Sequence, residues 1–229
     1  MKKAIVGEGP AVAGPCFVNE HVFCCGRTRS GKTTWARAYA ARWPGPVLFV
    51  NTQEERMPRG WTSAGPEHSI RVLVRALRAG DRVDYVPSAE DVTARAELGC
   101  LVDLLFRRAP WSPPVLLAVD ETHVYAPQSP TPSPLHRIAR RGLRWGIVGL
   151  WISQRPANVS KDLVTQCARH IIFQTSWEGG YFSDHGIPAE EVSRLLSAGG
   201  DYSYVVWDGA QLTGPFREIF LERQRGVKV

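Results

Sequence analysis

The chain has 229 residues, of which 44% are hydrophobic; this suits one α/β domain, and no apolar run approaches the ~20 residues of a membrane-spanning helix, so we expect a protein that is neither secreted nor membrane-spanning. Its five cysteines form no C-x-x-C pair, which argues against a disulfide framework and against a zinc site. Lys and Arg outnumber Asp and Glu by 28 to 22, for a formal net charge of +6; this favours an anionic partner such as nucleic acid, although a solvated basic surface has the same composition.

The first part of the sequence predicts a strand, a helix and a second strand. Residues 1–20 contain several Gly and Pro and are expected to form an irregular lead-in. The short apolar run 21–25 predicts a buried strand, a glycine turn follows, and residues 32–42 suit a helix that Pro44 ends. Residues 47–51 predict a second buried strand. This order is the βαβ unit typical of a parallel sheet.

The next segment mixes charged and amphipathic stretches. Residues 52–69 are expected to form a charged loop, followed by a helix over 70–79 and a short strand over 82–86. Ser88 is predicted to cap the amino terminus of a long helix that reaches Arg108.

The most apolar strand of the chain is predicted over 115–119, and Asp120 and Glu121 follow it. A proline-rich loop over 126–134 and a basic helix over 135–141 come next.

Strands over 147–153 and 171–175, a helix over 189–198 and two late strands, 202–207 and 217–221, complete the pattern. The sequence therefore predicts an α/β fold with a mostly parallel central sheet flanked by helices, plus an antiparallel pair of C-terminal strands. The whole chain, 1–229, is expected to be one domain, with a lead-in over 1–20, a core over 21–175 and the late helix and strand pair within 176–229.

Residues 26–33 (GRTRSGKT) match the pattern G-x-x-x-x-G-K-[ST] between a predicted strand and a predicted helix. Glycines at both ends let backbone N–H groups surround a phosphate at the positive end of the helix dipole. Lys32 is then expected to reach the β and γ phosphates, and the Thr33 hydroxyl to ligate Mg²⁺. We expect ATP and Mg²⁺ as cofactors, with nucleotide contacts from Gly26, Arg27, Thr28, Arg29, Ser30, Gly31, Lys32, Thr33 and Thr34.

The acidic pair Asp120 and Glu121 stands at the carboxyl end of a predicted parallel strand, where such sheets bind ligands. Asp120 is expected to hold the Mg²⁺ shell through water, and Glu121 to polarise the attacking water as a general base. The alternative is an acidic pair that merely caps a helix.

Three segments resemble the HerA/FtsK group of ring-forming, DNA-pumping ATPases. Residues 120–127 (DETHVYAP) resemble the acidic motif of the group, with its following histidine and aromatic residue, except that Thr122 stands where alanine is usual. Residues 138–146 (IARRGLRWG) resemble the basic helix and glycine that precede the next strand, and 152–156 (ISQRP) resemble the segment with a strand-end glutamine. The resemblance covers about residues 21–175.

This resemblance implies roles for individual side chains. Gln154 would sense the γ-phosphate and the lytic water, and Arg140 matches the position from which an arginine reaches the nucleotide of the neighbouring subunit. Arg141 and Arg144 are alternatives to Arg140, and a solvated or DNA-facing helix surface is the other interpretation of all three. His123 lacks partners at metal-ligand spacing, so we expect it to have a structural or coupling role.

A motor of this size resembles the genome-packaging ATPases of membrane-containing icosahedral viruses. The resemblance implies a ring, expected to be a hexamer, that moves double-stranded DNA into a preformed capsid and docks on capsid or viral-membrane vertex proteins, in the host cytoplasm and on the virion. A plasmid or mobile-element DNA translocase, and a nucleotide-gated assembly switch, remain alternatives. Surface positions considered for DNA contact, with an ordinary solvated surface favoured for each, are Arg56, Arg59, Arg155, Lys161 and Arg169.

Overall fold

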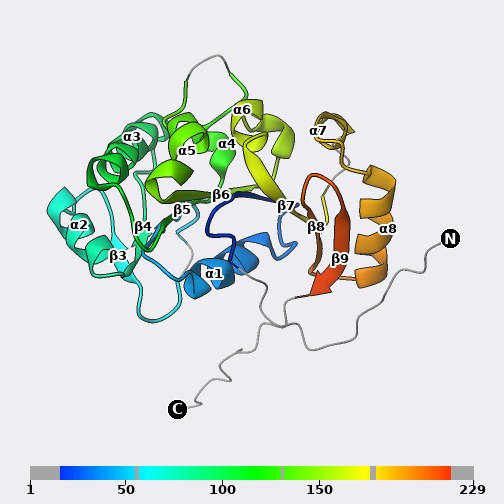
Figure 1. The fold of residues 1–229 in the computed structure, drawn as a ribbon, viewed down its shortest axis with the longest axis horizontal. Helices are drawn as coiled ribbons and strands as arrows, with labels where there is room; N and C mark the ends of the chain where they lie inside the picture. Colours follow the sequence, from blue (N-terminus) through cyan, green and yellow to red (C-terminus); the bar gives the residue numbers. More distant parts are fainter. Residues whose placement is uncertain (1–15, 55–56, 130–131, 176–178, 218–229) are drawn as a thin grey trace, which may run out of the picture.

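A nine-stranded sheet runs through the molecule in the order β3-β4-β2-β5-β6-β1-β7-β8-β9 (Figure 1). The computed structural model describes residues 16–54, 57–129, 132–175 and 179–217. Neighbouring strands from β3 to β7 are parallel, and β8 and β9 add antiparallel pairings at one edge. The strands are β1 (His21–Cys25), β2 (Val47–Val50), β3 (Thr62–Ala64), β4 (Arg82–Tyr85), β5 (Val115–Val119), β6 (Ile147–Ser153), β7 (Cys167–Phe173), β8 (Ser203–Trp207) and β9 (Leu212–Arg217).

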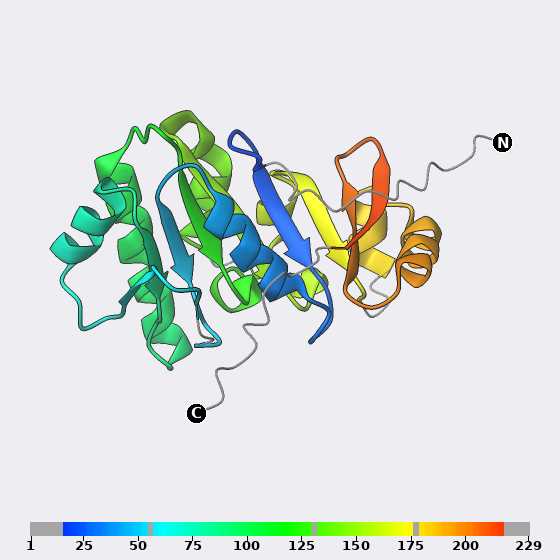
Figure 2. The ribbon, with the colours of Figure 1, turned by 90° about the horizontal axis from the view of Figure 1, so that it is seen from below.

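Helices cover both faces of this sheet. Helix α1 lies on one face, whereas α3 to α6 lie on the other and α8 packs on the antiparallel edge strands (Figures 1 and 2). The helices are α1 (Lys32–Arg42), α2 (Ile70–Arg78), α3 (Asp91–Arg108), α4 (Thr122–Tyr125), α5 (Leu135–Arg141), α6 (Lys161–Val164), α7 (Gly179–Asp184) and α8 (Ala189–Gly199), with 3-10 turns η1 (Leu143–Trp145) and η2 (Pro156–Asn158).

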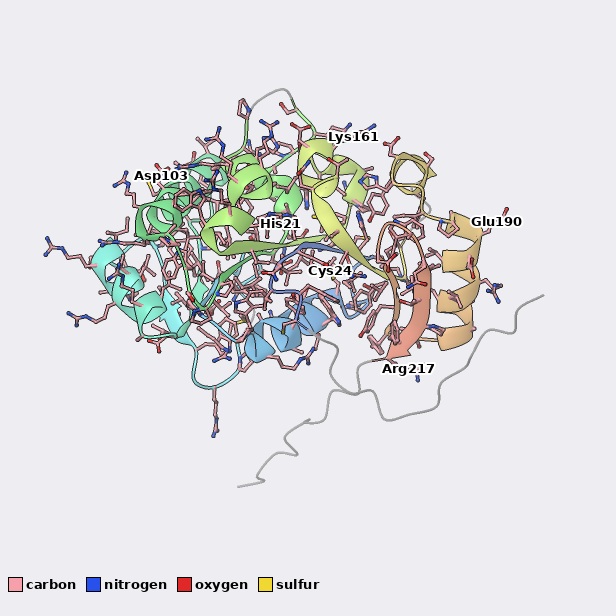
Figure 3. All side chains as sticks on the ribbon, in the orientation of Figure 1. His21, Cys24, Asp103, Lys161, Glu190 and Arg217 are labelled. Atoms are coloured by element: carbon pink, nitrogen blue, oxygen red, sulfur yellow. The ribbon has the colours of Figure 1, made fainter. Side chains whose placement is uncertain are left out.

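The central strands β2, β5 and β6 are almost continuously apolar because both faces of the sheet are buried there. Successive side chains of β1 alternate between the two faces: Cys24 packs in the cluster that contains Trp35 of α1, and Phe23 packs against Tyr181 of α7. Figure 3 shows Cys24 in the interior of the molecule and charged side chains such as Asp103 at its periphery.

The parallel register brings the carboxyl ends of the central strands to one edge. Cys25 of β1 is opposite Ser153 of β6, and Val119 of β5 is opposite Trp151 of β6. The Gly26 N–H continues this pairing by donating to the Ser153 carbonyl at 3.3 Å. The segments that follow β1, β5 and β6 therefore begin side by side.

The expected fold class is confirmed, and the predicted helix over 135–141 and strand over 147–153 have the predicted bounds. One predicted cap is wrong. Glu90, not Ser88, is the residue before α3, and its side chain makes no capping hydrogen bond in the described structure. Ser88 instead donates its hydroxyl and its N–H to the carboxylate of Glu97, which lies in the second turn of the helix.

Two segments contain structure where a loop or a later boundary was predicted. Residues 52–69 include the three-residue strand β3, which is too short to give a periodic signal. Strand β7 begins at Cys167 rather than at residue 171.

The predicted C-terminal strand pair exists, but its second member comes earlier than 217–221. The Asp208 carboxylate accepts the N–H groups of Ala210 (3.0 Å) and Gln211 (2.8 Å), and this tight turn sends the chain straight back into β9. Most of the predicted strand 217–221, most of the lead-in 1–20 and Arg56 lie outside the described residues. No helix within the described ranges is both long enough and apolar enough to cross a membrane.

Candidate nucleotide site

The turn between β1 and α1 has the backbone of an anion-binding loop. Arg29 and Gly31 have positive φ angles of 63° and 100°. Helix α1 begins at Lys32 with no acidic residue in its first turn and, within the described structure, no capping side-chain hydrogen bond. Its first N–H groups and the positive end of its dipole thus remain available to an anion. A Cβ on Gly26 would lie 2.6 Å from the Phe173 Cβ, so only glycine fits there.

The side chains of this loop divide into buried and exposed groups. Lys32 is 4% exposed, and the Ser30 hydroxyl is buried with no hydrogen-bond partner among the described residues. Thr33 is half-buried and Thr34 exposed, both in the first turn of α1. The predicted nucleotide contacts therefore lie together in the loop and the first turn of α1, and the buried positive charge of Lys32 lies beneath them.

Asp120 follows β5 and is fully buried. Its Oδ1 accepts the Glu121 N–H at 2.9 Å, while its Oδ2 has no hydrogen-bond partner in the described part of the chain. Burial and the neighbouring Glu121 charge raise the pKa of Asp120 to about 6, against the opposing effects of the Glu121 N–H and of Lys32. A buried carboxylate oxygen without a donor is suited to a cation or its bound water.

The residues present fit Mg²⁺. This ion is usually held by one or two oxygen side chains together with phosphates and water, which matches Asp120 and the Thr33 hydroxyl beside a phosphate loop. Among the described residues, no cluster of three or more His, Cys, Asp or Glu side chains could hold a metal ion by itself. When bound with a nucleotide, Mg²⁺ would neutralise charge on the β and γ phosphates.

Gln154 connects the loop to the second carboxylate. The Thr28 hydroxyl donates to the Gln154 Oε1 at 2.5 Å, and the Gln154 Nε2 donates to the Glu121 Oε1. Glu121 is 4% exposed and adopts a left-handed conformation, φ 48°, which is uncommon for a residue with a side chain. His123 places its Nδ1 3.3 Å from the other Glu121 oxygen. The predicted base and the predicted sensor are thus in direct contact, and both lie beside the loop.

Two hydrogen bonds explain why a threonine, Thr122, stands where alanine is usual. Its buried hydroxyl donates to the Val119 carbonyl at 2.9 Å and accepts the Ile152 N–H at 3.0 Å. Alanine can make neither contact. The hydroxyl ties the end of β5 to the end of β6, and so fixes the distance between Glu121 and Gln154.

Sequence reasoning missed a second glutamine at this edge. The backbone N–H and the guanidinium of Arg27 donate to the carbonyl and the side chain of Gln174, both at 2.7 Å. Gln174 follows β7 as Gln154 follows β6, and that position was the available signal. Its contacts hold the loop to the strand on the far side of β1 from the carboxylates.

The three candidate trans-acting arginines are not in the site of their own chain. Arg140 is exposed on α5 and pairs with Asp162 at 2.5 Å. Arg141 and Arg144 are exposed and make no ion pair among the described residues. Because α5 leads through η1 into the amino end of β6, its last turn lies toward the opposite edge of the sheet from the phosphate loop. These three arginines are therefore remote from the phosphate loop of their own chain.

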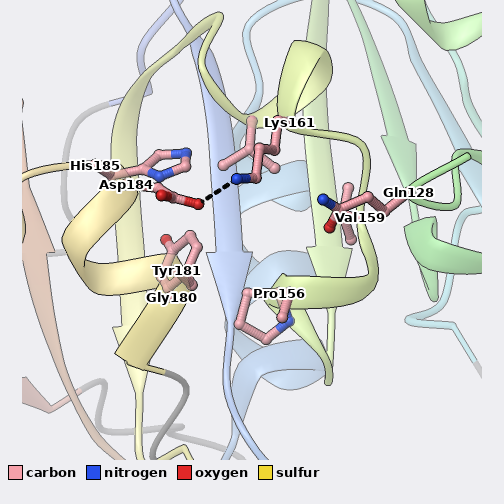
Figure 4. Close-up of a pocket in the computed structure, with 10 residues that line it drawn as sticks. Gln128, Pro156, Val159, Lys161, Gly180, Tyr181, Asp184 and His185 are labelled. Atoms are coloured by element: carbon pink, nitrogen blue, oxygen red, sulfur yellow. Dashed lines mark ion pairs between the residues drawn. The ribbon is translucent and has the colours of Figure 1, made fainter.

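Two of the surface cations considered for DNA contact are already paired. Lys161 contacts Asp184 at 2.7 Å at the border of a cavity of about 200 Å³ between α6, η2 and α7 (Figure 4). Arg169 pairs with Glu20 at 2.8 Å and with Asp208 at 3.2 Å. Arg59 and Arg155 are exposed. None of the residues lining the cavity belongs to the phosphate loop.

Mg²⁺ binding with ATP is expected to weaken about tenfold per pH unit below pH 6, because protonated Asp120 cannot hold the cation. The affinity falls on acidification because, with its raised pKa, the Asp120 carboxyl group is charged above about pH 6 and neutral below it. The Mg²⁺ dependence of ATP hydrolysis between pH 7.5 and pH 5 measures this. Asp120→Asn is the control, because ATP itself takes up protons equally in both measurements while the variant lacks the carboxyl group. Equal pH dependence of the Mg²⁺ requirement in both proteins would contradict the assignment.

No family model matches the chain. Over 64 residues it is 34% identical to the DNA double-strand break repair helicase HerA of Pyrococcus furiosus, a match that covers 27% of this chain and 12% of the helicase. The chain thus matches only a small part of the length of that relative.

Solved structures give a longer match. The genome packaging NTPase of Sulfolobus turreted icosahedral virus 2, in complex with ATP-gammaS, has a TM-score of 0.63 and 14% identity over 87% of this chain and 99% of that chain. Its complex with sulfate has a TM-score of 0.64 and 16% identity, covering 88% and 98% of the two chains. The DNA-packaging ATPase of Sulfolobus turreted icosahedral virus has a TM-score of 0.59 and 16% identity, covering 87% and 98%. This chain therefore shares the fold of the genome-packaging NTPases of turreted icosahedral viruses, and a short part of it is similar in sequence to a HerA helicase.

Proposed function

We propose that this chain is an ATPase that translocates double-stranded DNA, and that its task is to package a viral genome into a preformed capsid. The observation that carries the proposal is the hydrogen-bonded chain from Thr28 through Gln154 to Glu121. It joins the phosphate loop, a γ-phosphate sensor and a general base in one site. A protein that only bound nucleotide would not require a buried carboxylate held at that place.

Each residue has a defined part in the proposed hydrolysis. The loop N–H groups and Lys32 hold the β and γ phosphates, and Asp120 with Thr33 holds Mg²⁺. Gln154 orients the lytic water, and Glu121 accepts its proton as the water attacks the γ-phosphorus. The bond between the γ-phosphorus and the β,γ-bridging oxygen breaks, with ADP as the leaving group. Release of the inorganic phosphate then removes the group that Gln154 contacts, and the loss of this contact would report hydrolysis to the rest of the subunit.

The DNA and ring parts of the proposal rest on the fold likeness to packaging NTPases and on the position of Arg140. An arginine remote from its own nucleotide site can act only on a neighbour, which requires head-to-tail contacts that close into a ring. We propose a hexamer that docks on capsid or viral-membrane vertex proteins, in the host cytoplasm and on the virion.

Linear double-stranded DNA is expected to stimulate steady-state ATP hydrolysis by the wild type, and Lys32→Ala is expected to lose about 10²–10³-fold in rate with or without DNA. The lysine is the buried positive charge beneath the loop. Lys161→Ala is the matched control for hydrolysis without DNA, since Lys161 is exposed and paired with Asp184. Hydrolysis by a wild type that neither binds nor is stimulated by duplex DNA would contradict the motor.

A further inference from the structure

An aromatic side chain from the C-terminal part of the chain borders the phosphate loop. A Cβ built on Gly31 would lie 3.4 Å from the Tyr202 Cδ1 and 3.7 Å from the Tyr202 Cβ. Gly31 immediately precedes α1 and Lys32, so this tyrosine stands at the point where the loop enters the helix. The Tyr202 side chain is nevertheless 59% exposed. It therefore offers a free ring surface beside the loop.

The backbone at Tyr202 is held in an unfavourable conformation. Its φ angle is 61°, in the left-handed region that bulky residues rarely adopt. Two residues later, Tyr204 packs between Phe173 (ring centroids 5.2 Å apart) and Trp35 of α1 (6.0 Å), which fixes the start of β8 against the loop. A strained position occupied by an exposed ring is poorly explained by stability and points to a use in binding.

The order of strands shows which end of a nucleotide meets this ring. The carboxylates Asp120 and Glu121 follow β5 and Gln154 follows β6, all on one side of β1. Strands β7 and β8 lie on the other side, and Tyr202 directly precedes β8. If the γ-phosphate faces the carboxylates, as the proposed function requires, the α-phosphate and the base extend toward β7 and β8. Tyr202 presents an exposed aromatic ring on that side of β1.

We propose that Tyr202 stacks on the base of the bound nucleotide. An aromatic face recognises the π surface of any base and is strongest with a purine, so it selects for a base without distinguishing adenine from guanine by hydrogen bonds. The proposal rests on the proposed function, since it takes the nucleotide orientation from the carboxylates. It adds a determinant of nucleotide affinity that lies outside the loop motif and in a different part of the chain.

The test is to compare the binding of ATP and of tripolyphosphate by titration calorimetry. Tyr202→Ala is expected to weaken ATP binding about 5- to 150-fold and to leave tripolyphosphate binding unchanged, because only the base is lost from the contact. Tyr202→Phe keeps the ring and is expected to bind ATP within about twofold of the wild type. Trp145→Ala, which removes a ring that is 41% exposed near the other edge of the sheet, is the matched control.

The variant Tyr202→Gly distinguishes base stacking from a structural role of the Tyr202 side chain. Glycine accepts a φ of 61° without strain, so this variant is expected to melt at the wild-type temperature or above while losing ATP affinity like Tyr202→Ala. Wild-type ATP affinity in Tyr202→Ala, or an equal loss of tripolyphosphate binding, would overturn the stacking proposal. If instead the wild type bound ATP no better than Lys32→Ala, the nucleotide site itself would be wrong, and with it the proposed function.

Discussion

Glu121→Gln is expected to slow ATP hydrolysis by about 10²–10⁴-fold while ATP binding persists. Glutamine has the same shape and can still accept a hydrogen bond from Gln154, but it cannot accept the proton of the attacking water. Loss of the charge also removes a repulsion on Asp120, so the pKa of Asp120 is expected to fall and Mg²⁺ binding to be retained. Single-turnover hydrolysis and equilibrium ATP binding, measured on the same preparation, separate the two effects.

Glu97→Gln is the matched control for this substitution. Glu97 is a half-buried glutamate on α3 that accepts hydrogen bonds from Ser88 and Tyr85, away from the phosphate loop. It is expected to leave the rate of hydrolysis unchanged, although it can lower stability. Hydrolysis by Glu121→Gln at the wild-type rate would remove the general base from the mechanism and favour the nucleotide-gated switch over the motor.

The parts of the site that the sequence predicted are those encoded in short contiguous segments. The loop 26–33 lies between β1 and α1, and the acidic pair follows the apolar strand β5, as expected. Gln154, which the family resemblance pointed to, directly follows β6, and β6 pairs in parallel with β5. In each case the local pattern places the residue, because parallel strands collect their carboxyl ends at one edge.

The features that the sequence did not reveal depend on contacts between distant segments. The packing of Tyr202 against Gly31 joins the C-terminal hairpin to the loop, and no periodicity marks it. Serine is a common helix-capping residue, yet the Ser88 hydroxyl donates to the nearby Glu97 carboxylate instead of capping the helix end. Strand β3 is held by its pairing with β4 rather than by an apolar pattern. Tertiary pairing decided each of these features.

Arg140→Ala is expected to lower ATP hydrolysis by about 10³–10⁵-fold if this arginine stabilises the transition state on the neighbouring subunit. Its ion pair with Asp162 is no obstacle, because both side chains are about 60% exposed and exposed pairs contribute little. The activity should return in part when Arg140→Ala is mixed with Lys32→Ala. Some interfaces of a mixed ring combine an intact loop from one subunit with an intact arginine from the other.

Arg137→Ala provides the control on the same helix, since Arg137 is committed to Asp103 at 2.7 Å and lies over the Phe106 ring. Arg141→Ala and Arg144→Ala complete the series. A large loss confined to one of these two would move the trans-acting role to that residue and keep the ring mechanism. Wild-type rates in the variants of Arg140, Arg141 and Arg144, or no recovery on mixing, would mean that α5 and η1 do not complete the neighbouring site. The cluster would then be better explained as a DNA-facing or solvated surface, and the ring would need another source of trans charge.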